Sequence, residues 1–152
     1  MKKNAFIIAL FIITMASNAQ VNNNYSLKLD HIAISVKDVE KSVAFYKNIL
    51  NLEEITNKTK KEGIRWMSLN DGKELHLIST IKGEVVLNKA VHIAFTISNI
   101  DALLKELNAK NIIYSDWSGK INTITTRADG VKQIYFQDPD GYWIEINTST
   151  TE

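Results

Sequence analysis

The pattern of hydrophobic and polar residues runs through the same series of elements twice along the chain. In the first part, alternation with a period of two predicts strands over 26–36, 53–57, 63–69 and 73–79. An apolar stripe at helical spacing predicts a helix over 39–50, with Asp38 as its N-cap and Asn51 at its end. The first part is therefore predicted to be β-α-β-β-β.

The second part repeats this order after a link at 80–89. A helix is predicted from a cap at Asn99 or Asp101 to about Ala109, and the predicted strands cover 91–97, 112–114, 121–127, 132–137 and 142–147. One such unit has a helix on only one face of its sheet, so the two units must pair to protect the other face. The sequence predicts an α+β domain over 27–148, with module one at 27–80 and module two at 90–148.

The N-terminus has the features of a secretory signal peptide. Lys2 and Lys3 precede an apolar run, and the small residues Ser17 and Ala19 suit a signal peptidase that cleaves after Ala19. The prediction is a signal peptide at 1–19, a flexible leader at 20–26 and an exported, bacterial periplasmic protein. A membrane anchor is the alternative, but the apolar run is short for a bilayer span. After cleavage we expect no membrane association.

Charge and cysteine content exclude several classes of function. Loss of two lysines with the signal peptide changes the formal net charge from +1 to −1, and no basic block is present. A nucleic-acid partner is therefore not expected. The chain has no cysteine, which excludes disulfides and a zinc–thiolate site. The partner that remains is a small-molecule substrate.

Metal-type side chains lie at equivalent positions of the repeat. His31 and His92 each lie on the first strand of a module. His76 and Glu145 each follow the glycine of a turn by four residues, on the last strand of a module. A lone strand histidine is usually a core or surface residue, but the repeated placement favours a shared metal site. For Glu145 the alternative is a solvated carboxylate.

The sequence resembles the vicinal oxygen chelate superfamily, also called the glyoxalase and extradiol-dioxygenase superfamily. The resemblance covers about 27–147, and its most specific motif runs from Phe136 to Ile146 and contains Asp-Pro-Asp-Gly. It implies an open, cup-shaped barrel built from two paired β-α-β-β-β modules, with one divalent metal ion in the cup. By resemblance His31, His92 and Glu145 are metal ligands, and the fourth position falls at His76.

The resemblance leaves some roles open. His76 is either a ligand or a hydrogen-bonding neighbour of the ligands. Imidazole and carboxylate donors suit zinc, nickel, iron, cobalt or manganese. A general base is also needed, for which Glu145 and Glu74 are the candidates, although Glu74 could be only a surface charge next to a turn. Strand residues that either face the cup or pack elsewhere are Arg65, Trp66, Trp117, Arg127, Lys132, Tyr135 and Trp143.

These residues favour a divalent-metal-dependent lyase or isomerase of glyoxalase type, whose substrate chelates the metal through adjacent oxygens. Export argues against a glutathione-type co-substrate, and hence against a lactoylglutathione lyase or thiol transfer to fosfomycin. A sequestering protein of the same fold is the alternative, and an extradiol-type dioxygenase is a further one. Members of the superfamily often dimerise, so a homodimer is an open alternative, although both modules lie in one chain and one site is expected to close within the monomer.

Overall fold

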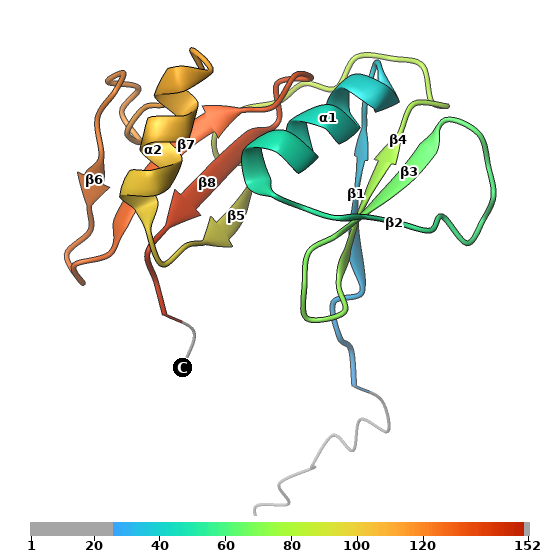
Figure 1. The fold of residues 1–152 in the computed structure, drawn as a ribbon, viewed down its shortest axis with the longest axis horizontal. Helices are drawn as coiled ribbons and strands as arrows, with labels where there is room; N and C mark the ends of the chain where they lie inside the picture. The colour runs from blue at the N-terminus through green and yellow to red at the C-terminus, as the bar shows by residue number, and fades with distance from the viewer. Residues whose placement is uncertain (1–25, 151–152) are drawn as a thin grey trace, which may run out of the picture.

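Two β-α-β-β-β modules follow one another along the chain, as the sequence pattern predicts (Figure 1). The structure, a computed structural model, describes residues 26–150. The predicted signal peptide and most of the predicted leader lie outside the described residues. Within 26–150, no helix is long and apolar enough to cross a membrane. The predicted α+β fold of two paired modules is confirmed, and its sheets stay open rather than closing into a barrel.

Each module forms its own four-stranded mixed sheet. The first sheet has the order β1-β4-β3-β2, and its elements are β1 (His31–Ser35), α1 (Val39–Leu50), β2 (Glu54–Ile55), β3 (Ile64–Ser68) and β4 (Glu74–Ile78). The second sheet has the order β5-β8-β7-β6, and its elements are β5 (His92–Thr96), α2 (Ile100–Ala109), β6 (Thr125–Thr126), β7 (Lys132–Gln137) and β8 (Trp143–Asn147). In both sheets the first strand is an edge strand that pairs in parallel with the last.

The helices cover one face of each sheet, and the alternation of side chains along the strands places the apolar residues there. The shared core includes side chains that are almost completely buried: Tyr46, Met67, Leu75, Leu77, Leu107, Ile134, Phe136 and Ile144. The opposite face of each sheet, which we call the outer face, carries the polar and aromatic residues of the strands. The predicted site residues of both modules therefore lie on outer faces.

Helix α1 belongs to module one, also contacts module two, and lies between the two sheets in Figure 1. Its N-cap is Asp38, as predicted, and Asn51 ends it in the left-handed conformation. The Tyr46 hydroxyl donates a hydrogen bond to Asp138 (2.8 Å), and the Ser42 hydroxyl donates to Asp140 (3.0 Å). The Asp-Pro-Asp-Gly turn between β7 and β8 thus anchors module two against the helix of module one.

Four predicted strands are markedly shorter than the pattern indicates or absent. The first, predicted over 26–36, is reduced to β1, His31–Ser35. The backbone of 112–114 does not form a strand, because the Ile112 N–H bonds to Leu107 at the end of α2 and only Ser115 bridges to β7. The predicted strand over 121–127 is reduced to β6, since Asn122 takes a positive φ of 51° that interrupts the extended chain. Similarly, β2 ends early where the side chain of Asn57 begins a turn.

Candidate metal centre

The four predicted ligands occupy the same register in the two sheets. His31 is the first residue of β1, and Ala33, two residues later, lies opposite His76 on β4. His92 is the first residue of β5, and Ala94 lies opposite Glu145 on β8. The internal repeat seen in the sequence is therefore reproduced residue for residue in the strand pairing. We call His31 and His76 ligand pair one, and His92 and Glu145 ligand pair two.

Ligand pair one is a stack of rings on the outer face of the first sheet. The imidazole of His76 lies between the His31 ring and the Trp66 indole, with a centroid separation of 4.2 Å on each side. Each imidazole also has a carboxylate partner: His31 Nδ1 lies 2.7 Å from Asp30, and His76 Nε2 lies 2.8 Å from Glu74. As the strand alternation predicts, Glu74 shares a face with His76.

Ligand pair two brings an imidazole and a carboxylate into direct contact. His92 Nε2 lies 3.3 Å from Glu145 Oε2, and His92 Nδ1 is hydrogen-bonded to the Lys89 carbonyl (2.9 Å). Glu145 is only 7% exposed, so the alternative of a solvated carboxylate is wrong. Its two oxygens accept hydrogen bonds from the Tyr135 hydroxyl (2.6 Å) and the Asn147 amide (2.8 Å).

Burial and the adjacent carboxylate keep the Tyr135 phenol protonated. Desolvation, followed by the hydrogen bond to Glu145 and its charge, raises the pKa of Tyr135. The phenol is therefore a stable donor to the carboxylate, and its own oxygen accepts a hydrogen bond from the Gln133 amide (3.0 Å). From the sequence, Tyr135 was only one of the strand residues that either face the cup or pack elsewhere, and this role was not found. Tyr135 lies directly opposite Glu145 in the ladder between β7 and β8, a register that only the structure shows.

The two ligand pairs are not brought together in one chain. Among residues 26–150, no group of three or more histidine, aspartate or glutamate side chains is arranged to hold a metal ion. Ligand pair one belongs to the first sheet and ligand pair two to the second. The expectation that one site closes within the monomer is therefore not met.

The donor atoms of the pairs nevertheless fit a divalent ion. A carbonyl or carboxylate oxygen only accepts, so the nitrogens of His31, His76 and His92 that bond to Asp30, Glu74 and the Lys89 carbonyl carry a proton, and the other nitrogen of each ring is the one that would ligate an ion. A ligating imidazole whose second nitrogen is held by an oxygen acceptor is the usual arrangement in metal sites. Glu145 adds one carboxylate to three imidazoles.

Lys89 organises the surroundings of ligand pair two, a role that no sequence pattern indicates. Its ammonium donates to Ser115 Oγ (3.2 Å) and to the carbonyls of Asp116 (2.9 Å) and Trp117 (3.2 Å). It also lies 4.5 Å from the centre of the Trp143 ring. These bonds hold Trp117 where its indole meets the rings of His92 and Tyr135 edge-on.

The charged strand residues considered as substrate contacts lie elsewhere. Arg65 forms ion pairs with Glu54 and with Glu40 of α1, so it serves packing between the helix and the first sheet. Arg127 pairs with Asp129 at 2.5 Å, and Lys132 is an exposed residue at the start of β7. The aromatic residues Trp66, Trp117 and Tyr135, by contrast, all contact a predicted ligand.

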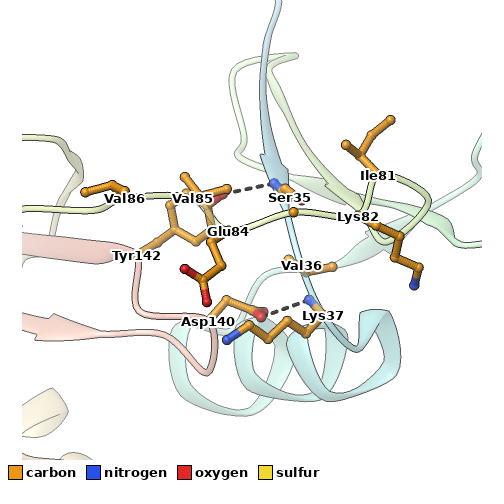
Figure 2. A pocket seen from close by; sticks show the side chains of 11 residues that line it. Ser35, Val36, Lys37, Ile81, Lys82, Glu84, Val85, Val86, Asp140 and Tyr142 are labelled. Carbon is orange, nitrogen blue, oxygen red and sulfur yellow. Dashed lines mark hydrogen bonds between the residues drawn. The ribbon is translucent and has the colours of Figure 1, made fainter.

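Two cavities lie near these elements. One, of about 420 Å³, lies between the end of β1, the link over 81–86 and the β7–β8 turn (Figure 2). There the Ser35 N–H donates to the Tyr142 hydroxyl (3.0 Å) and the Lys37 N–H to Asp140 (2.9 Å), but no predicted ligand lines it. The other, of about 480 Å³, is lined by both residues of ligand pair one.

Comparison with known proteins agrees with this geometry. A metallothiol transferase, FosB, from Staphylococcus saprophyticus is 30% identical over 130 residues, covering 82% of this chain and 78% of that protein. Among solved structures, the oxidase ChaP-H2 aligns with a TM-score of 0.69 and 23% identity over 83% of this chain and 96% of that one. The fosfomycin resistance protein FosX from Listeria monocytogenes aligns with a TM-score of 0.60 and 26% identity, over 83% and 96%.

A family model covers nearly the whole of the described domain. The model of the Glyoxalase/Bleomycin resistance protein/Dioxygenase superfamily matches residues 28–146, which include both ligand pairs and the Asp-Pro-Asp-Gly turn. The duplicated modules, the equal register of the two pairs and this match agree with one another. The chain belongs to the Glyoxalase/Bleomycin resistance protein/Dioxygenase superfamily.

Proposed function

We propose that this protein is a divalent-metal-dependent enzyme of glyoxalase type, a lyase or isomerase whose small substrate chelates the metal through adjacent oxygens. The observation that carries the proposal is the equal register of the two ligand pairs, each formed across a parallel pair of strands. Two unrelated packing histidines would have no reason to recur at the same register in both modules. A complete four-residue donor set also distinguishes this reading from a dioxygenase, which usually uses two histidines and one carboxylate.

We propose His31, His76, His92 and Glu145 as the residues that hold the ion. When bound, the ion supplies Lewis-acid stabilisation of negative charge on a substrate oxygen. The protein supplies the proton acceptor, for which the candidates are Glu74, already hydrogen-bonded to His76, and Glu145 itself. Tyr135 and Asn147 keep the Glu145 carboxylate in place.

A second copy of the chain is the proposed source of the missing half of each site. Each sheet leaves its first strand, β1 or β5, as an open edge with its predicted ligand at the start. If the outer face of the first sheet meets the outer face of the second sheet of a partner, ligand pairs one and two face each other, and a homodimer has two equivalent sites.

The names of the relatives suggest a second reaction class. FosB is named a metallothiol transferase and FosX a fosfomycin resistance protein. The alternative reaction is therefore the addition of a thiol, or of another nucleophile, to a small substrate. We propose that the protein is exported to the periplasm by the segment 1–19, where a cytoplasmic thiol co-substrate is scarce. That location favours an isomerase or lyase. The presence of all four candidate metal ligands argues against a protein that only sequesters its ligand.

The metal content of the purified protein tests the proposal. Purified without chelator, it should contain about one divalent ion per chain. His31→Ala and Glu145→Ala should both lose the ion, whereas Glu84→Ala, at an exposed position of the link, should retain it. Turnover of the hemithioacetal of methylglyoxal would support glyoxalase chemistry, and oxygen uptake with catechols would support the dioxygenase instead. No ion in the unaltered protein would indicate a sequestering protein.

A further inference from the structure

The cavity beside ligand pair one has an apolar and aromatic floor. Its volume is about 480 Å³, and it lies on the outer face of the first sheet. Ile64 and Ile78, which pair across β3 and β4, line one end, and Trp66 lines the middle. His31 and His76 line the other end. A molecule in this cavity would therefore contact both a hydrophobic surface and the proposed metal ligands.

One wall of the cavity is an ordered turn that presents two lysines. Lys58, Thr59 and Lys61 line the cavity from the connection between β2 and β3. Asn57 holds this turn: its side-chain oxygen accepts from the Thr59 N–H (2.9 Å), and its amide donates to the carbonyls of Lys61 (3.1 Å) and Ile64 (2.9 Å). The positions of the lysine backbones are thus fixed before any ligand arrives.

Two lysines and two carboxylates line the cavity. Each carboxylate accepts a hydrogen bond from a histidine, Asp30 from His31 and Glu74 from His76. Within residues 26–150, neither Lys58 nor Lys61 forms an ion pair at 4.0 Å or less. Two ammonium groups at the rim are therefore available to a negatively charged ligand.

A buried donor in the floor also lacks an acceptor. Trp66 is 8% exposed, and its indole N–H is the one buried side-chain polar atom in the described part of the chain without a hydrogen-bond partner. A buried unpaired N–H destabilises a fold by about 1–3 kcal/mol, so natural structures usually supply an acceptor. The indole nitrogen of Trp66 has less than 1 Å² of accessible surface, so a ligand in the cavity meets the Trp66 ring and not this N–H.

We propose that this cavity is an anion subsite, which binds the oxyanion group of a small organic acid between Lys58 and Lys61 and the apolar body of the acid against Trp66, Ile64 and Ile78. The inference rests on the proposed function only in assigning this acid as the substrate of the adjacent site. A carboxylate, phosphonate or phosphate group shares the required chemistry. The substrate of the enzyme would then carry such a group in addition to the oxygens that chelate the metal.

Binding of phenylphosphonate to the full chain tests the subsite. The protein is first stripped of metal and dialysed free of chelator, since phosphonates also bind metal ions. Titration is followed by the indole N–H resonance of Trp66, which a Trp66→Phe variant assigns. We expect a saturable shift, and Lys58→Gln/Lys61→Gln should weaken binding about ten-fold or more. The matched control, Lys41→Gln/Lys47→Gln, removes the same charge from exposed positions of α1 and should bind as the unaltered protein does.

Further probes separate the parts of the proposal. Inorganic phosphate should bind more weakly than phenylphosphonate, and benzyl alcohol should not bind measurably. Equal affinity of both lysine variants, or no saturable binding, would overturn the subsite. If phenylphosphonate fails to bind while the protein still takes up a divalent ion, the subsite is wrong and the proposed function stands. If phenylphosphonate binds and no ion is taken up, the subsite stands without the metal site.

Discussion

At the scale of single residues, the candidate donor set combines three imidazoles with one carboxylate. Such a set would leave a divalent ion with net positive charge, which suits stabilisation of a negative substrate oxygen. The neighbours differ between the two pairs. Asp30 and Glu74 accept from the imidazoles of pair one, whereas Tyr135 and Asn147 donate to the carboxylate of pair two. The partner of each ligand therefore complements its chemistry.

A buried carboxylate in the turn between β7 and β8 makes stability depend on pH. Burial raises the pKa of Asp138, although the hydrogen bonds from Tyr46, Tyr142 and Asp140 oppose the shift. The folded state therefore holds the proton more tightly than the unfolded state, and the free energy of unfolding falls as pH rises between the unfolded and folded pKa values. Asp138→Asn retains an oxygen for the two backbone N–H groups and cannot titrate. Relative to the unaltered protein, it should gain stability as pH rises through this interval, as measured by urea unfolding.

Asp129 provides a control of opposite sign. The backbone N–H of Val131, the largest cause, and Arg127 lower the pKa of Asp129, which is exposed. The ionised Asp129 carboxylate adds to the free energy of unfolding above its pKa in the unfolded chain. This contribution is lost as pH falls through its pKa in the folded protein. Asp129→Asn should therefore lose stability relative to the unaltered protein as pH rises. If Asp138→Asn and the unaltered protein differ in free energy of unfolding by the same amount at every pH, the raised pKa of Asp138 is contradicted.

The candidate ligands themselves could be predicted because the repeat places them at equal distances from recognisable turns. Their partners could not. Glu74 was considered only as a general base or a surface charge, and the Tyr135 bond to Glu145 depends on a ladder register that the sequence does not specify. Contacts between modules, such as Tyr46 with Asp138, depend on how the helix packs across the chain.

At the scale of elements, the helices and the longer strands followed from periodicity, while short edge segments did not. Helix α1 begins and ends where its cap residues predict. The segment 112–114 has strand-like composition, but the chain leaves α2 through a turn at Asn111 (φ 55°) and finds no continuous partner strand. Edge strands depend on such tertiary context more than on local preference.

Apart from the bridge between Ser115 and β7, the segment 115–117 is held by the side chain of Lys89. Lys89→Met keeps an unbranched stem and removes the ammonium, so the carbonyls of Asp116 and Trp117 lose their donor. We expect a loss of about 1–3 kcal/mol in the free energy of unfolding. Trp117 should also become more accessible to acrylamide, as measured by fluorescence quenching.

Lys120→Met is the matched control, because Lys120 is an exposed lysine of the same loop and its hydrogen bonds with Asp116 use backbone atoms, which the substitution keeps. It should leave stability and quenching nearly unchanged. If Lys89→Met behaves like this control, the lysine is a solvated side chain and the position of Trp117 is set by other contacts.

At the scale of the whole molecule, the main consequence of the fold is that each chain carries two different half-sites. One core joins the modules on the helix side, and the outer faces with their ligand pairs belong to separate sheets. Nothing in the sequence distinguishes a site closed within one chain from a site completed by a second copy, because both use the same residues. Only the relative placement of the modules separates these arrangements.

Mixing two inactive variants distinguishes the arrangements. His31→Ala damages ligand pair one, and Glu145→Ala damages ligand pair two, so each variant alone should lack metal. If module one of each chain faces module two of its partner, a mixed dimer has one doubly damaged site and one intact site. Unfolding and refolding an equal mixture should then restore about a quarter of the normal metal content, since half of the dimers are mixed. If each site closed within a chain, no mixture would contain an intact site, and elemental analysis would find no recovery.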